Sequence, residues 1–575
     1  MHRPLSALLA LSLLTMACSG GEAPKKESTG DQRDALVVAY QADADVLMEI
    51  VSQSASDGQI ISSLDYGTLD SEFDCELKYK PALYKTWTWS EDGKIISVEL
   101  RDDIKWSDGQ PVTADDIAFA YELVADPTVA SPRLNYVERM VPGKRPLVID
   151  PTHLEFHFTE AYDRNTQAAH IGLGPVAKHV VQGMDRSSLR GSPYATNPLV
   201  TGRWKVATWD RNQRIVLEPN DKFTGPKEEI PKLKRVIYKV IPDYTTRLVE
   251  LENGSVDFME AIQVADADRL AKEHPEIKLH RRGWRFMDYV AWNSIDPEDY
   301  KTRASSLGPD QKVALEQVKP HALFADKGVR VALGKAIDVD KLIAELLTSQ
   351  VTGEKYGKPA VGSITPALCN VKADDIARLP FDPSGAKAEL EALGWKDTNA
   401  DGVLDKGGVP FKFKLMTNSG NQRRAKAAII IQALLKDIGI EMEIEQVESN
   451  TFFERLRKKD YEAALSGWSA GLFIDPTDMW HSGPQHEFNF TSYNNPEVDK
   501  LIDAGMHEPD PAKAAVIWTE MERLIYADQP YAFLYWMDEI DGIHERFQDV
   551  KIDILSSMRD LHTWWVPADK VKYPQ

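Results

Sequence analysis

Residues 411–447 constrain the fold of this chain more than any other stretch, because they predict a strand, a helix and a second strand in that order. Apolar and polar residues alternate over 411–415, which is typical of a half-buried strand. Apolar residues then recur at helical spacing over 424–438, and the alternation returns at 440–444. Two strands joined through a helix need a long crossover, so the pattern favours an α/β fold with covered sheets.

Strand and helix signals alternate along the rest of the chain as well. Thr113, Asp243 and Asp382 stand where helix caps are expected, and Pro383 follows the last of them at the first helical position. We find no fixed-period repeat and no linker between independent modules, so we expect interwoven lobes. A short apolar strand is predicted at residues 36–40, and alternating strands are predicted at 96–100, 154–158 and 236–240.

The charge balance of the 575-residue chain excludes one large class of partner. The chain has 89 acidic and 68 basic side chains, which gives a formal net charge of -21. Proteins that bind phosphate backbones need clustered Lys and Arg. We therefore expect no nucleic acid partner.

The first 34 residues predict export rather than part of the fold. A basic residue precedes the apolar run 5–14, which is too short to span a bilayer and is typical of a secretory signal. The stretch that ends at Cys18 resembles a bacterial lipobox, although Thr15 stands where Leu is usual. We expect residues 1–17 to be a signal peptide and 18–34 a lipidated, polar tether. A cleaved, soluble secretory protein is the alternative, and no later segment predicts a transmembrane helix.

One motif raises an enzymatic alternative. The segment Gly467-Trp468-Ser469-Ala470-Gly471 satisfies the G-x-S-x-G pattern, in which a serine nucleophile stands on a strained turn between a strand and a helix. A strand before Ser469 fits, but Asp475-Pro476 follows within a few residues and argues against a helix directly after the serine. A secreted serine hydrolase is therefore the alternative function, and the main interpretation is not an enzyme.

No pattern in the sequence predicts a cofactor or a metal site. The chain has neither a G-x-x-x-x-G-K-[ST] phosphate loop nor an H-E-x-x-H pair. Residues 397–402 imitate the start of an EF-hand loop, but Gly408 occupies the position of the bidentate Glu. The three cysteines form neither a disulfide framework nor a C-x-x-C pair, and whether Cys75 and Cys369 pair is left open.

Several ordered segments carry a family resemblance that covers nearly the whole chain after the tether. The stretch from Ala82, ALYKTWTWSEDGKIISVELRDDIKWSDGQPVTADDIAFAYELVADP, resembles the signature region of bacterial solute-binding proteins of the peptide/nickel class. In that family a strand ends in an aromatic-polar-Asp-Gly turn before a Thr-capped helix, here Trp106, Asp108, Gly109 and Thr113. Further matches lie at residues 197–206, 214–223, 241–257, 324–343, 467–469 and 493–502.

The resemblance implies an α/β, two-lobed periplasmic-binding-protein fold with a hinge and an extra inserted small domain. The implied division of the chain is 35–65, 196–290 and 536–575 for the first lobe, 66–195 for the small domain, and 291–535 for the second lobe. The bound solute would pass to the permease subunits of a membrane ABC importer, and we expect a monomer without cofactor. Peptides are the leading ligand, followed by another organic solute.

Two other roles are less favoured. Nickel binding is less expected, because the His and Met residues do not cluster near the inferred cleft. A sensor that works without import is a third interpretation.

By the same resemblance, ligand contacts are expected at strand ends that face the interlobe cleft. Gln41 and Asp43 follow the predicted strand 36–40. In peptide-binding members, main-chain groups at the positions of Gly467 to Ser469 bond the peptide backbone, and a tryptophan at the position of Trp468 walls a side-chain pocket.

One departure from the family concerns the amino terminus of the ligand. Peptide-binding members place an Asp three residues after that tryptophan to pair with the terminal ammonium, and here this position is Gly471. We therefore expect weak recognition of free amino termini, unless Asp475 reaches the site from a rearranged loop.

Overall fold

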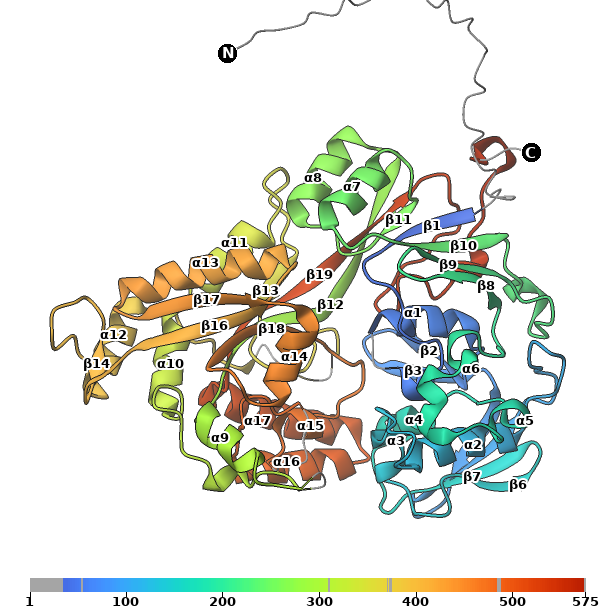
Figure 1. Cartoon of the computed structure of the whole chain (residues 1–575), viewed down its shortest axis with the longest axis horizontal. Helices are drawn as coiled ribbons and strands as arrows, with labels where there is room; N and C mark the ends of the chain where they lie inside the picture. Colours follow the sequence, from blue (N-terminus) through green and yellow to red (C-terminus); the bar gives the residue numbers. More distant parts are fainter. Residues whose placement is uncertain are drawn as a thin grey trace, which may run out of the picture.

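The computed structural model describes residues 35–52, 55–308, 311–369, 371, 375–482 and 488–572. The predicted signal peptide, the tether and Cys18 lie outside the described residues. Two α/β lobes lie side by side, and a smaller body packs below one of them in the view of Figure 1. The α/β fold with two lobes and an inserted small domain, predicted from the sequence, is confirmed.

One eleven-stranded sheet runs through both lobes. Strands of the second lobe form one end of this sheet and strands of the first lobe form the other, so main-chain hydrogen bonds join the two lobes (Figure 1). Strand β13 (Gly357–Pro359) pairs with β19 beside the main path. The order along that path is β17 (Glu441–Val447), β16 (Lys412–Asn418), β18 (Ala463–Ser469), β12 (Ile277–Trp292), β19 (Tyr531–His544), β11 (Phe258–Met259), β1 (Ala35–Tyr40), β10 (Arg235–Val240), β9 (Arg214–Pro219) and β8 (Trp204–Asp210).

The strands β12 and β19 belong to both lobes and form the hinge between them. Residues 277–282 of β12 pair with the end of β19 that contacts β11, and residues 286–291 pair with the other end of β19. The register shifts between these two stretches, where Trp284 has a left-handed φ of 61°. Asp538 accepts a hydrogen bond from the Trp284 N–H at 3.2 Å. Such a bulge bends a strand locally, which suits a hinge.

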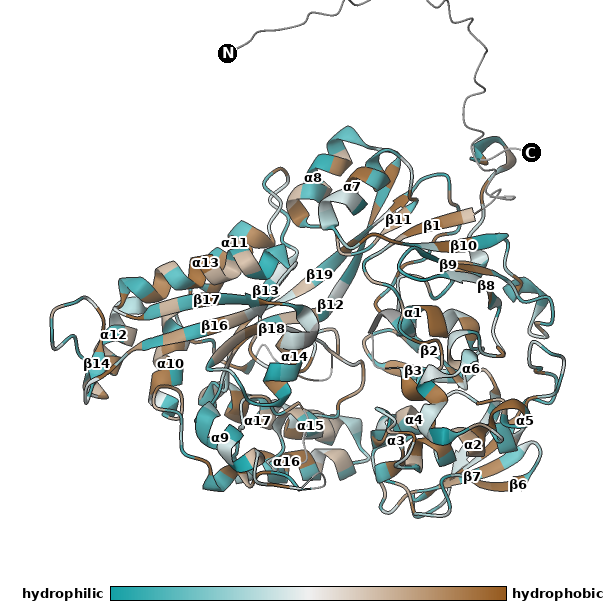
Figure 2. Cartoon of the chain, in the orientation of Figure 1, coloured by the Kyte–Doolittle hydropathy of each residue, from teal (hydrophilic) through white to brown (hydrophobic). Residues whose placement is uncertain are grey.

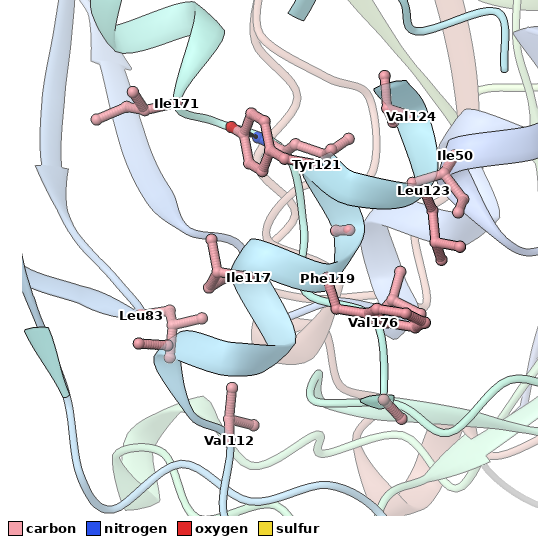
Figure 3. Packing of buried hydrophobic residues seen from close by; sticks show 14 of the residues in the cluster. Ile50, Leu83, Val112, Ile117, Phe119, Tyr121, Leu123, Val124, Ile171 and Val176 are labelled. Atoms are coloured by element: carbon pink, nitrogen blue, oxygen red, sulfur yellow. Dashed lines mark hydrogen bonds between the residues drawn. The ribbon is translucent and has the colours of Figure 1, made fainter. Parts of the chain in front are cut away.

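The small domain is built on a four-stranded sheet covered by α2 (Ala114–Ala125). Thr113 and Asp116 form the capping box expected from the sequence. Apolar side chains of α2 face Leu83, Ile171 and Val176 in a closely packed core (Figure 3). The strands of this domain are β4 (Tyr84–Trp89), β5 (Ile95–Leu100), β7 (His153–His157) and β6 (Leu147–Asp150), with a separate hairpin of β2 (Leu69–Phe73) and β3 (Leu77–Pro81).

The strand–helix–strand unit predicted for residues 411–447 is present in the second lobe. Strands β16 and β17 pair in parallel, and α13 (Gln422–Asp437) connects them. This is the long crossover that parallel strands require. The remaining helices of this lobe are α9 (Pro297–Ala304), α10 (Lys327–Ala336), α11 (Val339–Leu346), α12 (Pro383–Ala392), α14 (Ser449–Arg457), α15 (Thr477–Trp480), α16 (Pro496–His507) and α17 (Pro511–Asp528). The short strands β14 (Asp405–Lys406) and β15 (Val409–Pro410) form a separate hairpin.

Each body buries its own apolar core. Figure 2 shows apolar residues along strands such as β1, whereas helices such as α7 and α8 carry a polar and an apolar side. Within the described part of the chain, no helix is both long enough and apolar enough to cross a membrane. The other helices are α1 (Ala55–Leu64), α7 (Tyr244–Glu252) and α8 (Val264–Glu273) in the first lobe, and α3 (Asn135–Glu138), α4 (Arg164–His170), α5 (Lys178–Val181) and α6 (Pro193–Thr196) in the small domain.

Candidate ligand-binding site

Strand β18 ends at the junction of the lobes with one edge available for pairing. Its ladder with β16 extends only from Ala463 to Leu465, whereas its ladder with β12 continues to Ser469. Among the described strands, the main chain of residues 466–469 is therefore paired through β12 alone. An edge of this kind can take up an extended chain as an additional strand.

Gly467 lies where the surrounding groups leave no room for a side chain. A Cβ atom built on Gly467 would collide with Arg424 Nη2 and would lie 2.5 Å from Asp288 Oδ1 and 2.7 Å from the main-chain oxygen of Met287. The absence of a side chain thus lets the end of β18 approach a buried ion cluster. The family resemblance had already singled out Gly467. The close packing around it explains why a residue without a side chain is needed at this position.

The ion cluster behind Gly467 is centred on Asp288, whose side chain is fully buried. Arg423 Nε lies 2.8 Å from Asp288 Oδ2, and Arg424 Nε lies 3.0 Å from Asp288 Oδ1. Tyr535 donates its hydroxyl to the same carboxylate at 3.2 Å. Burial alone would raise the pKa of Asp288, but the two guanidinium groups outweigh it and hold the pKa at about 2. The base of the site is a fixed, ionised network.

Trp468 stands in an aromatic group of the second lobe. Its ring is nearly parallel to that of Phe490, with 5.4 Å between centroids, and meets the edge of Phe488 at 5.5 Å. Its indole N–H is donated to the Tyr531 hydroxyl at 3.3 Å. The side chain is only half-buried. Trp468 thus has an internal partner for its polar group, and what it can offer a ligand is apolar surface.

Ser469 and Gly471 follow at the exposed end of β18. Ser469 is the last residue of the strand, and the next helix, α15, starts only at Thr477. The strand–turn–helix context of a nucleophile elbow is missing at this place, so nothing here supports the serine hydrolase alternative. A Cβ on Gly471 would lie 3.3 Å from the main-chain oxygen of Phe473, so a side chain there needs only a small adjustment.

Asp475 contacts the small domain. Its Oδ2 atom lies 2.8 Å from Arg139 Nη1, and both side chains are about one-fifth exposed, at 20% and 18%. Arg139 Nη2 also donates to the hydroxyl of Thr477 at 3.3 Å. Burial alone would raise the pKa of Asp475, but Arg139 lowers it below its ordinary value. The Asp475 carboxylate, the candidate partner for a ligand ammonium, is thus already paired with a cation of the protein.

Gln41 and Asp43 lie in the loop that follows β1 in the first lobe. Asp43 accepts hydrogen bonds from Trp209 Nε1 at 3.0 Å and from the Asn212 N–H at 2.9 Å, so it fixes the loop after β1 to the turn between β8 and β9. Gln41 is exposed. Of these two predicted contacts, Gln41 is the one whose side chain is presented to solvent.

Sequence reasoning did not identify a second ion cluster on the first-lobe side of the hinge. Arg282 on β12 lies 2.6 Å from Asp541 and 3.4 Å from Glu260, and it also pairs with Glu539. Burial raises the pKa of Glu539 to about 7, although Arg282 opposes this rise. The basic run at 281–285 was a signal for this cluster, but its acidic partners lie far away in the sequence.

A large cavity lies between the small domain and the second lobe. Its volume is about 850 Å³, which is within the roughly 300–1,000 Å³ range of small-molecule sites. Residues 131–135 and Arg139 line one side, and Asp475, Phe488 and Asn489 line the other. The cavity thus adjoins Asp475 and the aromatic group around Trp468.

The chain is similar in sequence to a known family and to a known relative. The model of the bacterial extracellular solute-binding proteins, family 5, matches residues 78–489. The oligopeptide-binding protein AppA of Bacillus subtilis is 27% identical over 578 aligned positions, which cover 98% of each chain.

Solved structures show the same architecture. The structure of AppA from Bacillus subtilis in complex with a nonapeptide superposes with a TM-score of 0.77 at 26% identity, covering 93% of this chain and 99% of that one. NikZ from Campylobacter jejuni in complex with Ni(L-His) gives a TM-score of 0.76 at 20% identity, covering 92% and 99%. The second likeness concerns the fold alone.

Proposed function

The chain belongs to family 5 of the bacterial extracellular solute-binding proteins, and we propose that it captures peptides in the cleft between its lobes for import by an ABC transporter. The observation that carries the choice of peptides is the edge of β18 at residues 466–469, which is paired on one side only. A peptide main chain can add to this edge through backbone hydrogen bonds, independent of its side chains.

The similarity to AppA supports a peptide rather than a metal complex, because that protein is named for oligopeptides and matches along nearly the whole chain. Among the described residues, no group of three or more His, Cys, Asp or Glu side chains could hold a metal ion. Gln41, Gly467 to Ser469 and Gly471 are proposed as the ligand-contacting positions. The proposed role is binding and delivery, without a catalytic residue.

The proposal includes the domain division given by the sequence. The hydrophobic clusters support most of it, because residues 291–535 supply nearly all of the two cores of the second lobe, to which the hinge strands add residues at 287–290 and 536–537. The core of residues 66–195 also takes in Val46, Met48, Ile50 and Val51 from the preceding segment. The small domain is therefore packed firmly on the first lobe, and we propose that these two bodies move together.

Calorimetry with matched peptides tests the proposed ligand. Since Gly471 replaces the usual carboxylate and Asp475 is paired with Arg139, a buried peptide ammonium would lack a counter-ion, which is costly. Peptides with acetylated amino termini should therefore bind at least as tightly as the same peptides with free termini. Gly471→Asp should shift the preference toward free termini, and Gly471→Asn, with the same shape and no charge, should not.

Native mass spectrometry of the purified protein supplies the peptides for this comparison, because a closed cleft can retain its ligand. A strong preference of the unchanged protein for free amines would show that another carboxylate serves the amino terminus. Retention of a different organic solute, together with no binding of any peptide, would refute the peptide assignment.

The proposal also places the protein outside the cytoplasm on a lipid anchor at Cys18, with the permease subunits as its partners. Stable attachment needs acyl chains buried in the bilayer. Cys18→Ala should therefore release the protein from the membrane fraction, as measured by fractionation and by mass spectrometry of the N-terminal peptide. An unlipidated, soluble wild-type protein would show that the anchor is wrong while leaving the binding role intact.

A further inference from the structure

A disulfide joins Cys75 to Cys369, two residues separated by 294 positions in the sequence. Their Cα atoms lie 5.3 Å apart. Cys75 stands in the turn between β2 and β3, and Cys369 stands in the segment that follows β13. The Cys369 N–H also donates to the main-chain oxygen of Cys75 at 3.4 Å.

The two cysteines belong to bodies on opposite sides of the hinge. The β2–β3 hairpin is held to the first lobe by Arg559, which contacts Asp70 and the main-chain oxygen of Ser71. The Cys369 segment is held to the second lobe, where Val361 and Val371 on either side of Cys369 lie in a core made only of residues 287–536. The disulfide therefore connects bodies that do not share a hydrophobic core.

The other contacts described between the small domain and the second lobe are non-covalent. Arg139 pairs with Asp475, as described above. The Asp163 N–H donates to the main-chain oxygen of Met506 at 3.0 Å, and His507 Nε2 lies 3.0 Å from Glu160 Oε2. These contacts can break and re-form as the lobes rotate, whereas the covalent bond between the two sulfurs cannot.

The disulfide is accessible to a reagent in solution. Cys369 is exposed and Cys75 is only partly covered. Attack by a thiolate requires access to one sulfur, and exposed disulfides are the ones that exchange readily. The bond is thus placed where its reduction and re-formation are both feasible in the closed molecule.

We propose that the Cys75–Cys369 disulfide is a redox-controlled latch across the ligand cleft. With the bond formed, the hairpin is tied to the second lobe and the lobes stay close together. With the bond reduced, rotation about β12 and β19 opens the cleft and lets the ligand exchange. This inference rests on the proposed function only for the identity of the cargo, because the restraint on the lobes follows from the position of the bond.

The reductant required is a dithiol, either a small molecule or a protein with two neighbouring cysteines. One of its thiolates attacks Cys369 Sγ, which forms a mixed disulfide and releases Cys75 as a thiolate that takes up a proton. The second thiol of the reagent then attacks the mixed disulfide and frees Cys369 as a thiol. The dithiol is oxidised to its own disulfide, and two electrons pass to the latch.

The test compares the full-length protein, oxidised and after treatment with dithiothreitol, with the Cys75→Ser/Cys369→Ser double variant. The double variant treated with dithiothreitol, which has no latch to reduce, is the matched control and should not change on treatment. Small-angle scattering without ligand should show a larger radius of gyration for the reduced protein and for the double variant. The dissociation rate of a bound peptide should rise at least about tenfold in both, because the tether keeps the facing surfaces at a high effective concentration.

Two results would overturn the latch. The first is an isolated protein with free thiols at Cys75 and Cys369 that do not oxidise in a glutathione redox buffer. The second is an unchanged radius and dissociation rate after mass spectrometry has verified reduction. If the radius of gyration increases on reduction but no peptide binds, the latch is supported and the peptide cargo is rejected. The experiment therefore distinguishes failure of the latch from failure of the proposed function.

Discussion

At the scale of single residues, the end of β18 shows how a missing side chain shapes a binding site. Gly467 brings the strand against Asp288 and Arg424, and the neighbouring Trp468 turns its polar group inward to Tyr531. What remains toward the cleft is main chain and aromatic surface. This combination suits a ligand recognised by its backbone rather than by one particular side chain.

Gly467→Ala should therefore be strongly disruptive. The new methyl group would meet Arg424 and Asp288, and overpacking of this kind costs roughly 1–3 kcal/mol of stability. We expect a lower unfolding midpoint in urea and a clear loss of peptide affinity. Gly471→Ala is the matched control for stability and should keep the wild-type unfolding midpoint, since its Cβ would approach only Phe473, at 3.3 Å. Equal behaviour of the two variants would contradict the packing argument.

The sequence identified the residue types of the site but not all of their partners. Gly467, Trp468 and Ser469 were named because they match a family pattern, and they lie at the end of β18; their contact with a ligand stays a prediction. The sequence could not reveal that Arg139 pairs with Asp475 or that Trp209 holds Asp43. Such pairs join distant segments, and no local spacing records them.

At the scale of elements, the helix caps were predicted correctly, because a cap depends only on residues that are close together in the sequence. Asp243 caps α7 through the Thr246 N–H, and Asp382 caps α12, as expected from the sequence. The long hinge strands were not predicted. Residues 277–292 of β12 face a different environment at each end, mostly polar and partly exposed up to Phe286 and fully buried from Met287 on, so no single period describes them.

Glu522 on α17 offers a test of stability against pH. It is buried and accepts hydrogen bonds from the Ser363 N–H at 2.6 Å and from the Ser363 hydroxyl at 2.7 Å. Burial raises the pKa of Glu522 from 4.5 to about 7, although the hydrogen bonds from Ser363 act to lower it. The folded state thus holds a proton that the unfolded chain loses above about pH 4.5, so this contribution to stability falls as the pH rises toward 7.

Glu522→Gln keeps the neutral form at every pH. Its stability relative to the wild type should increase between pH 5 and pH 8, by up to about 3 kcal/mol. Urea unfolding at several pH values measures this difference. Glu520→Gln on the same helix, with 44% of the side chain exposed, is the control and should run parallel to the wild type. Parallel curves for Glu522→Gln as well would mean that this carboxyl is ionised in the folded protein.

At the scale of the whole molecule, contacts between the small domain and the second lobe decide how firmly the cleft stays shut. The ion pair of Arg139 and Asp475 is the most buried of the ionic contacts described across this gap. The two-lobed arrangement was predictable, because ordered family matches run along the chain. The contacts between the small domain and the second lobe were not predictable, because they depend on the relative position of parts of the chain that have separate cores.

Arg139→Ala should weaken the closed state without unfolding either lobe. Removal of the cation leaves Asp475 partly buried without its partner, and hydrogen bonds to charged groups contribute roughly 1.5–3 kcal/mol. We expect weaker peptide binding by calorimetry and a faster dissociation rate. A double-mutant cycle with Asp475→Asn should give a clear coupling energy, and Lys144→Ala, an exposed cation nearby, should change nothing. Additive effects of the two substitutions would show that the pair does not hold the cleft.

The place of β19 in the sheet has a consequence for how the chain is made. β19 is the last strand in the described chain, yet it pairs with β11, β12 and β13 near the middle of the sheet. Ribosomes add about 5–20 residues per second, so β12, complete at Trp292, waits on the order of ten seconds or longer for Tyr531 to be added. During that wait the bare edges of β11 and β12 are open to wrong partners. The sheet that joins the lobes is therefore complete only after the last described strand has joined it.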